Sequence, residues 1–374
     1  MKIRLLSSGW MDVVAVGGAV RNSSGHWRLE CRQLDLAYYR LELRPGYDHQ
    51  YSDCMVCGYV GGPVIIATSS LADILDDNIP ISMAIMDMAI QKLGMMLACP
   101  DMMFFTTKSV AQDVFESQSS EWKKLATKHQ FQGIQTLFHH SLDHTFSCDQ
   151  VNLSCDIRSQ SSAFLVPWCC VSSFRYILTH LEIISQKLGI EYALDSGSTL
   201  GAVKLGNFIP WDIDMDIDFK TEYFPLFKPG GQAYEYLTKA GIQLYNFNKD
   251  DYGVKDAGLF FMFYGGIMVE MMGSIKPLSR ELLPSHLNSL TTRVEVGPDL
   301  WIPVTSHPGL YARGRYGPGY LYHVQSWRFK SGMTGSYGRY SPGAWQPCSQ
   351  PGHHACLNNY PIQVNQCNYR RKEK

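Results

Sequence analysis

The sequence predicts an α/β protein of the α+β kind, built around a mixed β-sheet. Three stretches predict this class: a helical pattern at 171–190, a strand of alternating polarity at 205–220, and a β-hairpin at 259–273. The chain has 374 residues, a length that favours two domains over one. Its hydrophobic content of 45% and charged content of 18% are ordinary for globular proteins.

The composition excludes several classes of partner. A formal net charge of −1 gives no electrostatic reason to expect nucleic acid or an anionic membrane surface. No apolar run approaches the roughly 20 residues needed to cross a bilayer, so we expect no membrane anchor within this sequence. The first 20 residues begin basic, but Asp12 and several glycines interrupt the apolar core that a signal peptide needs.

Residues 1–145 are expected to form an irregular α/β domain. Short apolar runs at 63–67 and 102–107 suit strands, and residues 119–130 suit a helix. No Asp-x-Asp pair occurs in this region. We therefore expect it to have a structural or acceptor-positioning role.

The cysteines are unevenly distributed along the chain. Four of the 11 fall within one short segment: Cys148, Cys155, Cys169 and Cys170. Four thiolates this close can bind one Zn²⁺ tetrahedrally, whereas in an oxidising compartment they could form one or two disulfides. The adjacent pair would bond poorly to each other but could reach one metal, so from spacing alone a zinc-binding loop at 146–170 and disulfides both stay open.

A clear helix is predicted at 171–190, where apolar residues recur at helical spacing. Ser172 or Ser173 is expected to cap its start and Gly189 to end it. A strand should follow and turn into a short helix at Gly197 and Ser198. Backbone N–H groups at such a turn can bind an anion, although ordinary turn chemistry explains the same pair.

Within 205–220, acidic residues occupy every second position from 212 to 218: Asp212, Asp214, Asp216 and Asp218. On a strand, residues two apart face the same way, about 6.6 Å apart. One interpretation is an edge strand whose acidic face meets water. The other is a divalent cation held among the carboxylates, because hard ions such as Mg²⁺ take oxygen ligands.

A hairpin is predicted at 259–273, where Gly265 and Gly266 join two apolar strands. Glu270 is the one charge in the second strand, so it must be exposed, paired or bound to a metal. Further along, several cations could hold a phosphate or belong to a solvated loop: Arg313, Arg315, Arg328 and Lys330. The remaining stretch, 346–374, is interpreted as a tail.

The stretch "LDSGSTLGAVKLGNFIPWDIDMDID" resembles the signature of the LicD/fukutin family of nucleotidyltransferase-fold enzymes. The resemblance covers about residues 170–330. It is strongest around the acidic row, the name used here for Asp212, Asp214, Asp216 and Asp218. Within the family the chain looks closest to the fukutin-related branch, which has two cysteines seven positions apart followed by a vicinal pair. It departs from the family where Leu205 follows Lys204 in place of a basic pair, and where the third acid is Glu270 followed by methionines.

The resemblance implies a fold and a domain order. Residues 171–345 would form a nucleotidyltransferase-fold catalytic domain with a mixed sheet, and 1–145 a glycosyltransferase-like stem. The implied reaction moves ribitol 5-phosphate, or a similar polyol or sugar phosphate, from a CDP-linked donor to a protein-linked glycan. The implied location is the Golgi lumen or secretory pathway, as for elaboration of the O-mannosyl glycan of α-dystroglycan. A homo-oligomer is compatible with these expectations.

The resemblance also implies roles for individual residues. Asp212, Asp214 and Asp216 become ligands of a catalytic Mg²⁺ or Mn²⁺, and Glu270 becomes the third catalytic acid. The donor would be bound by Gly197, Ser198, Lys204, Arg313 and Arg315. A structural Zn²⁺ in the loop at 146–170 would be bound by Cys148, Cys155, Cys169 and Cys170. Two alternatives stay open: phosphocholine transfer from CDP-choline to a glycan, and an inactive glycan-binding scaffold.

Overall fold

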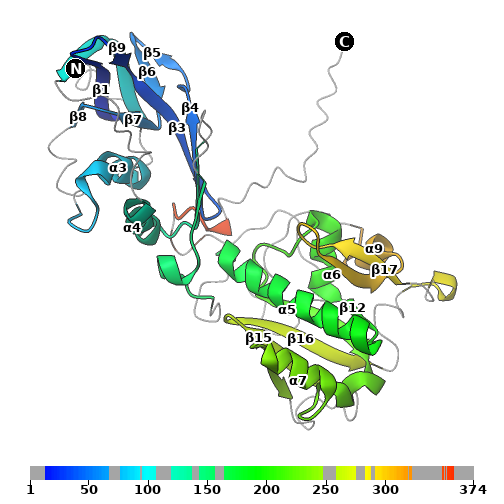
Figure 1. Cartoon of the computed structure of the whole chain (residues 1–374). Helices are drawn as coiled ribbons and strands as arrows, with labels where there is room; N and C mark the ends of the chain where they lie inside the picture. The colour runs from blue at the N-terminus through cyan, green and yellow to red at the C-terminus, as the bar shows by residue number, and fades with distance from the viewer. Residues whose placement is uncertain are drawn as a thin grey trace, which may run out of the picture. The chain divides into compact units, whose positions relative to one another are not determined.

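The computed structural model describes residues 13–66, 76–92, 95–106, 119–136, 143–155, 164–246, 258–274, 283–287, 291–318, 320–321, 348, 350 and 352–357. The chain divides into two compact units, Met1–Leu153 and Ser154–Lys374, which are treated separately below (Figure 1). The boundary lies inside the predicted cysteine loop. Within the described residues, no helix is both long enough and apolar enough to cross a membrane.

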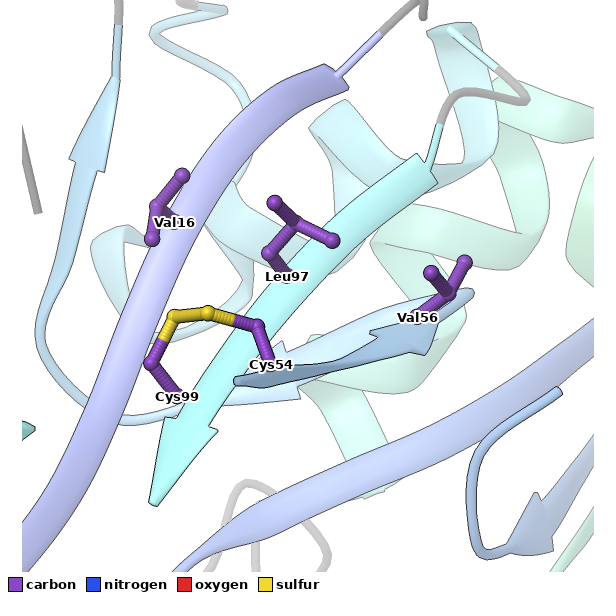
Figure 2. Packing of buried hydrophobic residues seen from close by; sticks show 5 residues of the cluster. All are labelled: Val16, Cys54, Val56, Leu97 and Cys99. Atoms are coloured by element: carbon purple, nitrogen blue, oxygen red, sulfur yellow. A yellow bond between two sulfur atoms is a disulfide. The ribbon is translucent and has the colours of Figure 1, made fainter. Parts of the chain in front are cut away.

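The first unit contains two β-sheets. One follows the order β2-β1-β9-β6-β5, and β8 pairs with β1 as well. Its strands are β1 (Val13–Asn22), β2 (Trp27–Arg28), β5 (Gln50–Tyr51), β6 (Cys54–Cys57), β8 (Val64–Ile66) and β9 (Met95–Thr106). Figure 2 shows the packing between β1, β6 and β9, where Val16 and Leu97 lie beside the Cys54–Cys99 disulfide.

The second sheet of this unit has the order β11-β10-β4-β3-β7. Its strands are β3 (Glu30–Ala37), β4 (Arg40–Pro45), β7 (Tyr59–Gly61), β10 (Gly133–Thr136) and β11 (Asp143–Thr145). The described helical elements are η1 (Ile81–Met83), α3 (Ala84–Lys92), α4 (Ser119–His129) and η3 (Asp149–Val151). The predicted helix at 119–130 is thus confirmed. The predicted strands match β8 and the end of β9, while Ala67 and Thr107 lie outside the described residues.

Disulfides pair cysteines that are far apart in this sequence. Cys31 on β3 bonds to Cys57 on β6, and Cys54 on β6 bonds to Cys99 on β9. Cys54 and Cys57, the two ends of a C-x-x-C motif, therefore bond to different partners. The motif is structural in this unit.

The second unit is built on one mixed sheet, which confirms the predicted fold class. Its order is β12-β13-β16-β15-β14, with β13 and β16 parallel and the other pairs antiparallel. The strands are β12 (Tyr192–Leu194), β13 (Asp214–Lys220), β14 (Gln243–Asn246), β15 (Leu259–Tyr264) and β16 (Ile267–Ser274). Gly265 and Gly266 form the predicted hairpin turn, with φ of 57° and 80°. Such left-handed angles at both positions are typical of a type I′ turn.

Helices and a small β-ribbon complete this unit. They are α5 (Trp168–Leu188), α6 (Ser196–Leu205), η5 (Thr221–Phe227), α7 (Gln232–Lys239), η6 (Ser285–Leu287), β17 (Thr291–Glu295), β18 (Trp301–Thr305) and α9 (Pro308–Tyr316). The long helix α5 packs against the β15–β16 hairpin and against α7 (Figure 1). Its buried face carries the apolar residues that predicted it, including Phe174, Ile177 and Leu181.

The end of α5 was predicted correctly and its start was not. Gly189 adopts the left-handed conformation (φ 68°) that terminates the helix. The helix begins at Trp168, however, after Pro167, so Ser172 and Ser173 lie inside it and do not cap it. The carbonyl of Pro167 already accepts hydrogen bonds from the N–H groups of Cys170 and Val171, which places the first turn ahead of both serines.

Candidate active site

The site begins where β12 gives way to α6. Strand β12 ends at Leu194, Asp195 follows, and α6 begins at Ser196, so the predicted strand-to-helix turn is present. Gly197 and Ser198 lie in the first turn of α6. The N–H groups of a first helical turn have no partner within the helix, and the helix dipole adds partial positive charge there. This end of α6 is therefore suited to bind an anion such as phosphate.

The acidic row meets this helix end at two points. A Cβ atom on residue 197 would lie 2.9 Å from Oδ2 of Asp212, so glycine allows the carboxylate to approach the helix. The backbone N–H of Asp216 donates to Oγ of Ser198 over 2.9 Å. Helix and strand are thus held together on the side where the carboxylates lie.

The prediction of one continuous strand over 205–220 is wrong. Helix α6 extends to Leu205 and ends at Gly206 in the left-handed conformation, and β13 begins only at Asp214. Asp212 therefore lies in the loop before the strand. Asp218 also departs from the expected pattern, because it is almost fully buried (1% exposed) and does not form part of a solvated acidic face.

Glu270 joins the acids from the neighbouring strand. It is the register partner of Asp216 in the parallel pair β13–β16. Burial raises the pKa of Glu270, and the charge of Asp214 raises it further. The Glu270 carboxyl therefore lies close enough to the acidic row for the charge of Asp214 to affect its pKa.

The acids at 212 and 216 are affected in the same way. Burial raises the pKa of Asp212 well above its usual value, and the charges of Asp214 and Asp216 add to the effect. Burial also raises the pKa of Asp216, followed by the charges of Asp214, Glu270 and Asp195, while Arg315 acts in the opposite direction. Several carboxylates thus share one poorly solvated space, an arrangement that a bound cation would stabilise.

The two arginines predicted for donor binding differ in their placement. Nη2 of Arg315 donates to Oγ of Ser196 over 2.6 Å, which brings this guanidinium to the start of α6. Arg313 is two residues earlier on α9 and is exposed to solvent. Arg328 and Lys330 lie outside the described residues.

Lys204 lies in the last turn of α6, seven residues after Gly197 and hence close to the same helix face. Burial lowers the pKa of Lys204 to about 8. Lys204 is thus about two helical turns from the end of α6 that is suited to bind an anion.

The sequence did not single out three residues of this site. Asp195 and Tyr311 are buried, and the Tyr311 hydroxyl donates to the Asp195 carboxylate. Ser196 adopts a left-handed backbone with φ of 45°. Asp195 could have been found from its place directly after a strand and before the Gly-Ser pair. Tyr311 has no local sequence feature that points to this site.

The second unit contains three of the four predicted zinc ligands, and these three lie close together. The sulfurs of Cys155, Cys169 and Cys170 lie within 4.8 Å of one another. Cys155 and Cys170 form a disulfide in the structure, and Cys169 is also oxidised. Zinc binds thiolates and not disulfides, so this oxidised form and a zinc site exclude each other. The zinc site stays a prediction.

Comparison with known proteins supports a catalytic assignment for this region. The family model described as LicD/FKTN/FKRP, nucleotidyltransferase domain, matches residues 189–256. Two curated proteins named ribitol 5-phosphate transferase FKRP, from Mus musculus and Homo sapiens, are each 30% identical over 84 residues. The aligned stretch covers 21% of this chain and only 17% of each relative. Residues 189–256 of this chain are therefore similar to the nucleotidyltransferase domain of the LicD/FKTN/FKRP family.

Proposed function

We propose that the second unit is a metal-dependent phosphotransferase. It would move ribitol 5-phosphate, or a similar polyol or sugar phosphate, from a CDP-linked donor to a glycan on a protein. One observation carries the proposal: acids from the 206–212 loop, β13 and β16 converge beside the first turn of α6. An anion-binding helix end next to a cation-binding acid cluster suits a diphosphate with its metal ion.

The acidic residues fit a hard divalent cation. Asp212, Asp214 and Asp216 would hold Mg²⁺ or Mn²⁺, since burial and then the neighbouring carboxylate charges raise the pKa of Asp212 and of Asp216, and a cation would offset both effects. When bound, such an ion neutralises charge on the diphosphate and on the departing phosphate oxygen. Glu270 faces the same cluster from β16.

The protein groups would act on both sides of the transferred phosphate. The N–H groups at the start of α6, together with Arg315, bind phosphate oxygens and orient the donor. Glu270 or Asp216 takes the proton from the acceptor hydroxyl, since a raised pKa makes a carboxylate a better base near neutral pH. The acceptor oxygen forms a bond to the distal phosphorus, the bond to the bridging oxygen breaks, and CMP leaves. Lys204 balances charge on the phosphates.

We propose the secretory pathway, and within it the Golgi lumen, as the site of action. Outside the four-cysteine motif, the described residues contain the disulfides Cys31–Cys57, Cys54–Cys99 and Cys348–Cys356. Disulfides persist in oxidising compartments and are rare in the cytosol. A glycan on a glycoprotein is an acceptor that this location supplies.

Donor binding and transfer test the proposal. The full chain is titrated with CDP-ribitol and with CDP-choline by calorimetry, with Mg²⁺ and with a chelator, and transfer is assayed on an O-mannosyl glycan acceptor. We expect CDP-ribitol to bind only with the divalent ion and to support transfer. Preference for CDP-choline would replace ribitol phosphate by phosphocholine as the transferred group. Binding of neither nucleotide would indicate a scaffold without activity.

Asp214→Asn tests the role of the acidic row. We expect transfer to fall by at least about 100-fold, because a charge that positions the metal and the diphosphate is lost. The melting temperature without metal should not fall, since removal of one like charge relieves repulsion on Asp212 and Asp216. Glu235→Gln, an exposed acid on α7, is the matched control and should keep full activity. Undiminished turnover by folded Asp214→Asn protein would refute the assignment.

A further inference from the structure

Helix α9 contacts the start of α6 through two side chains one helical turn apart. The Tyr311 hydroxyl donates to Oδ1 of Asp195 and accepts from the backbone N–H of Ser196 over 3.2 Å. Arg315, four residues later, donates to Oγ of Ser196. Oγ of Ser196 in turn donates to Oδ2 of Asp195 over 2.9 Å. Tyr311, Asp195 and Ser196 therefore form a closed ring of hydrogen bonds, which Arg315 joins from outside.

The ring is buried and polar. Tyr311 is 0% exposed and Asp195 is 5% exposed. Polar groups are costly to bury unless they are hydrogen-bonded, so the pairing of these groups specifies one arrangement of the turn. Burial, followed by the charge of Asp195, raises the pKa of Tyr311, so its hydroxyl keeps the proton that it donates.

The ring holds a strained backbone. Ser196 adopts φ of 45°, a conformation that residues with a Cβ atom rarely take. Such a residue persists only where its surroundings hold it in place. Here the N–H of Ser196 is bound by Tyr311, and its hydroxyl lies between Asp195 and Arg315.

The ring is also joined to the acidic row. The backbone N–H of Asp195 donates to the carbonyl of Asp216 over 3.0 Å. Displacement of the ring would therefore move three groups together: the first turn of α6, the Arg315 guanidinium and the adjoining part of β13. These are the groups assigned above to the phosphates and the metal.

We propose that Tyr311 and Asp195 are positioning residues for the proposed transfer reaction. They hold the first turn of α6 and direct Arg315 to the donor's phosphate, without touching the donor themselves. The inference rests on the proposed function for its kinetic test. It also adds α9 to the catalytic unit, although the family model matches only residues 189–256.

The test compares two tyrosine variants in the full chain. Tyr311→Phe removes the ring's hydroxyl, and Tyr192→Phe is the matched control, because Tyr192 is also buried and donates to a buried carboxylate, that of Glu182. We expect Tyr311→Phe to lower kcat/KM for the CDP-linked donor by about 10- to 100-fold, since small misplacement of positioning groups costs that much. Tyr192→Phe should stay within about twofold, because its hydroxyl donates to Glu182 on α5 and not to a member of the ring.

A conservative series at Asp195 separates positioning from general stability. Asn can still accept from Tyr311, whereas Ala cannot. We expect Asp195→Asn to retain more kcat/KM than Asp195→Ala, and the loss to include a raised KM for the donor. Equal kinetics in Tyr311→Phe and Tyr192→Phe, or losses that follow the melting temperature in both, would overturn the inference.

A measurement without substrate keeps this result distinct from failure of the proposed function. Amide hydrogen exchange at residues 196–198 should accelerate at least about tenfold in Tyr311→Phe and not in Tyr192→Phe, because the ring's bond to the Ser196 amide is lost. If the wild type uses no CDP-linked donor, the proposed function fails, and the exchange experiment still tests the ring. Unchanged exchange in Tyr311→Phe would overturn the inference.

Discussion

Asp87 is a buried acid that stays charged because donors surround it. It is 1% exposed, yet His129 donates to its Oδ1 over 2.6 Å, and Lys128 and Gln91 donate to its Oδ2 over 2.8 Å and 2.9 Å. Burial by itself would raise the pKa of Asp87, but the hydrogen bonds and charges of His129 and Lys128 outweigh it and hold the pKa below its usual value. The network joins α3 to α4 in the first unit.

Asp87→Asn should destabilise the first unit in a pH-dependent way. A carboxyl whose pKa is lowered by folding contributes stability above its unfolded pKa of about 3.9, and the contribution is lost as the pH falls through the folded value. At pH 7 we expect the free energy of unfolding to fall by about 1–3 kcal/mol. The difference from the wild type should shrink as the pH falls below about 4.

Denaturant unfolding between pH 3 and pH 7, followed by circular dichroism, measures this effect. Asp48→Asn is the control, because Asp48 and its partner His49 are both exposed and such pairs contribute little. A stability difference between Asp87→Asn and the wild type that stays constant over this pH range would show that the charge of Asp87 is not what matters.

The sequence predicted those site residues that lie close to one another along the chain. The Gly-Ser turn and the acids at 212–216 lie within 20 residues of one another and keep their relation in the structure. Asp195 and Tyr311 are 116 residues apart, and only the fold brings their side chains together. Arg313 and Arg315 could not be told apart either, because the face that each presents depends on how α9 packs.

At the scale of elements, α6 depends on a close approach by the loop that follows it. A Cβ atom at residue 201 would lie 2.8 Å from the carbonyl oxygen of Asn207 and 3.0 Å from the backbone nitrogen of Ile209. Both are backbone atoms, which cannot move as a flexible side chain can. This loop carries the chain to Asp212, so Gly201 affects both packing and the site.

Gly201→Ala should therefore lower stability and transfer together. Forcing a methyl group into a packed contact costs about 1–3 kcal/mol, and the displaced loop would move Asp212 away from Gly197. Thermal unfolding and the transfer assay measure the two effects. Gly314→Ala is the control: it lies on α9 with nothing within 4 Å of the new Cβ, so it should stabilise the chain by about 0.5–1 kcal/mol. If both variants behave alike, the contact does not constrain α6.

Helices and strands could be predicted where the hydrophobic pattern is continuous. Their boundaries could not be predicted where one element follows closely on another. The hairpin at 259–273 and the body of α5 follow from strand and helix periodicity alone. The start of α5 was missed because Pro167 begins the helix without a side-chain cap, and the two serines looked like better candidates. The strand at 205–220 was overextended because Leu205 belongs to α6.

At the scale of the whole molecule, the pairing of cysteines in disulfides could not be predicted from the sequence. The number of possible pairings rises steeply with the number of cysteines. Cys31 and Cys57 are 26 residues apart, and Cys54 and Cys99 are 45 apart, so their contacts depend on the completed sheets. The boundary between the two units, after Leu153, could not be located from composition either.

The four-cysteine motif provides the last prediction, because zinc and disulfides exclude each other at Cys148, Cys155, Cys169 and Cys170. We expect protein purified without chelators to contain about one zinc per chain, since four thiolates complete a structural site. These cysteines should then be alkylated once a chelator is added, without any reductant, and the melting temperature should fall as the metal leaves. Cys54 and Cys99 serve as internal controls, because their disulfide should resist alkylation until a reductant is present. Zinc-free protein whose four cysteines also require reductant would establish disulfides, such as the one between Cys155 and Cys170, in place of the metal.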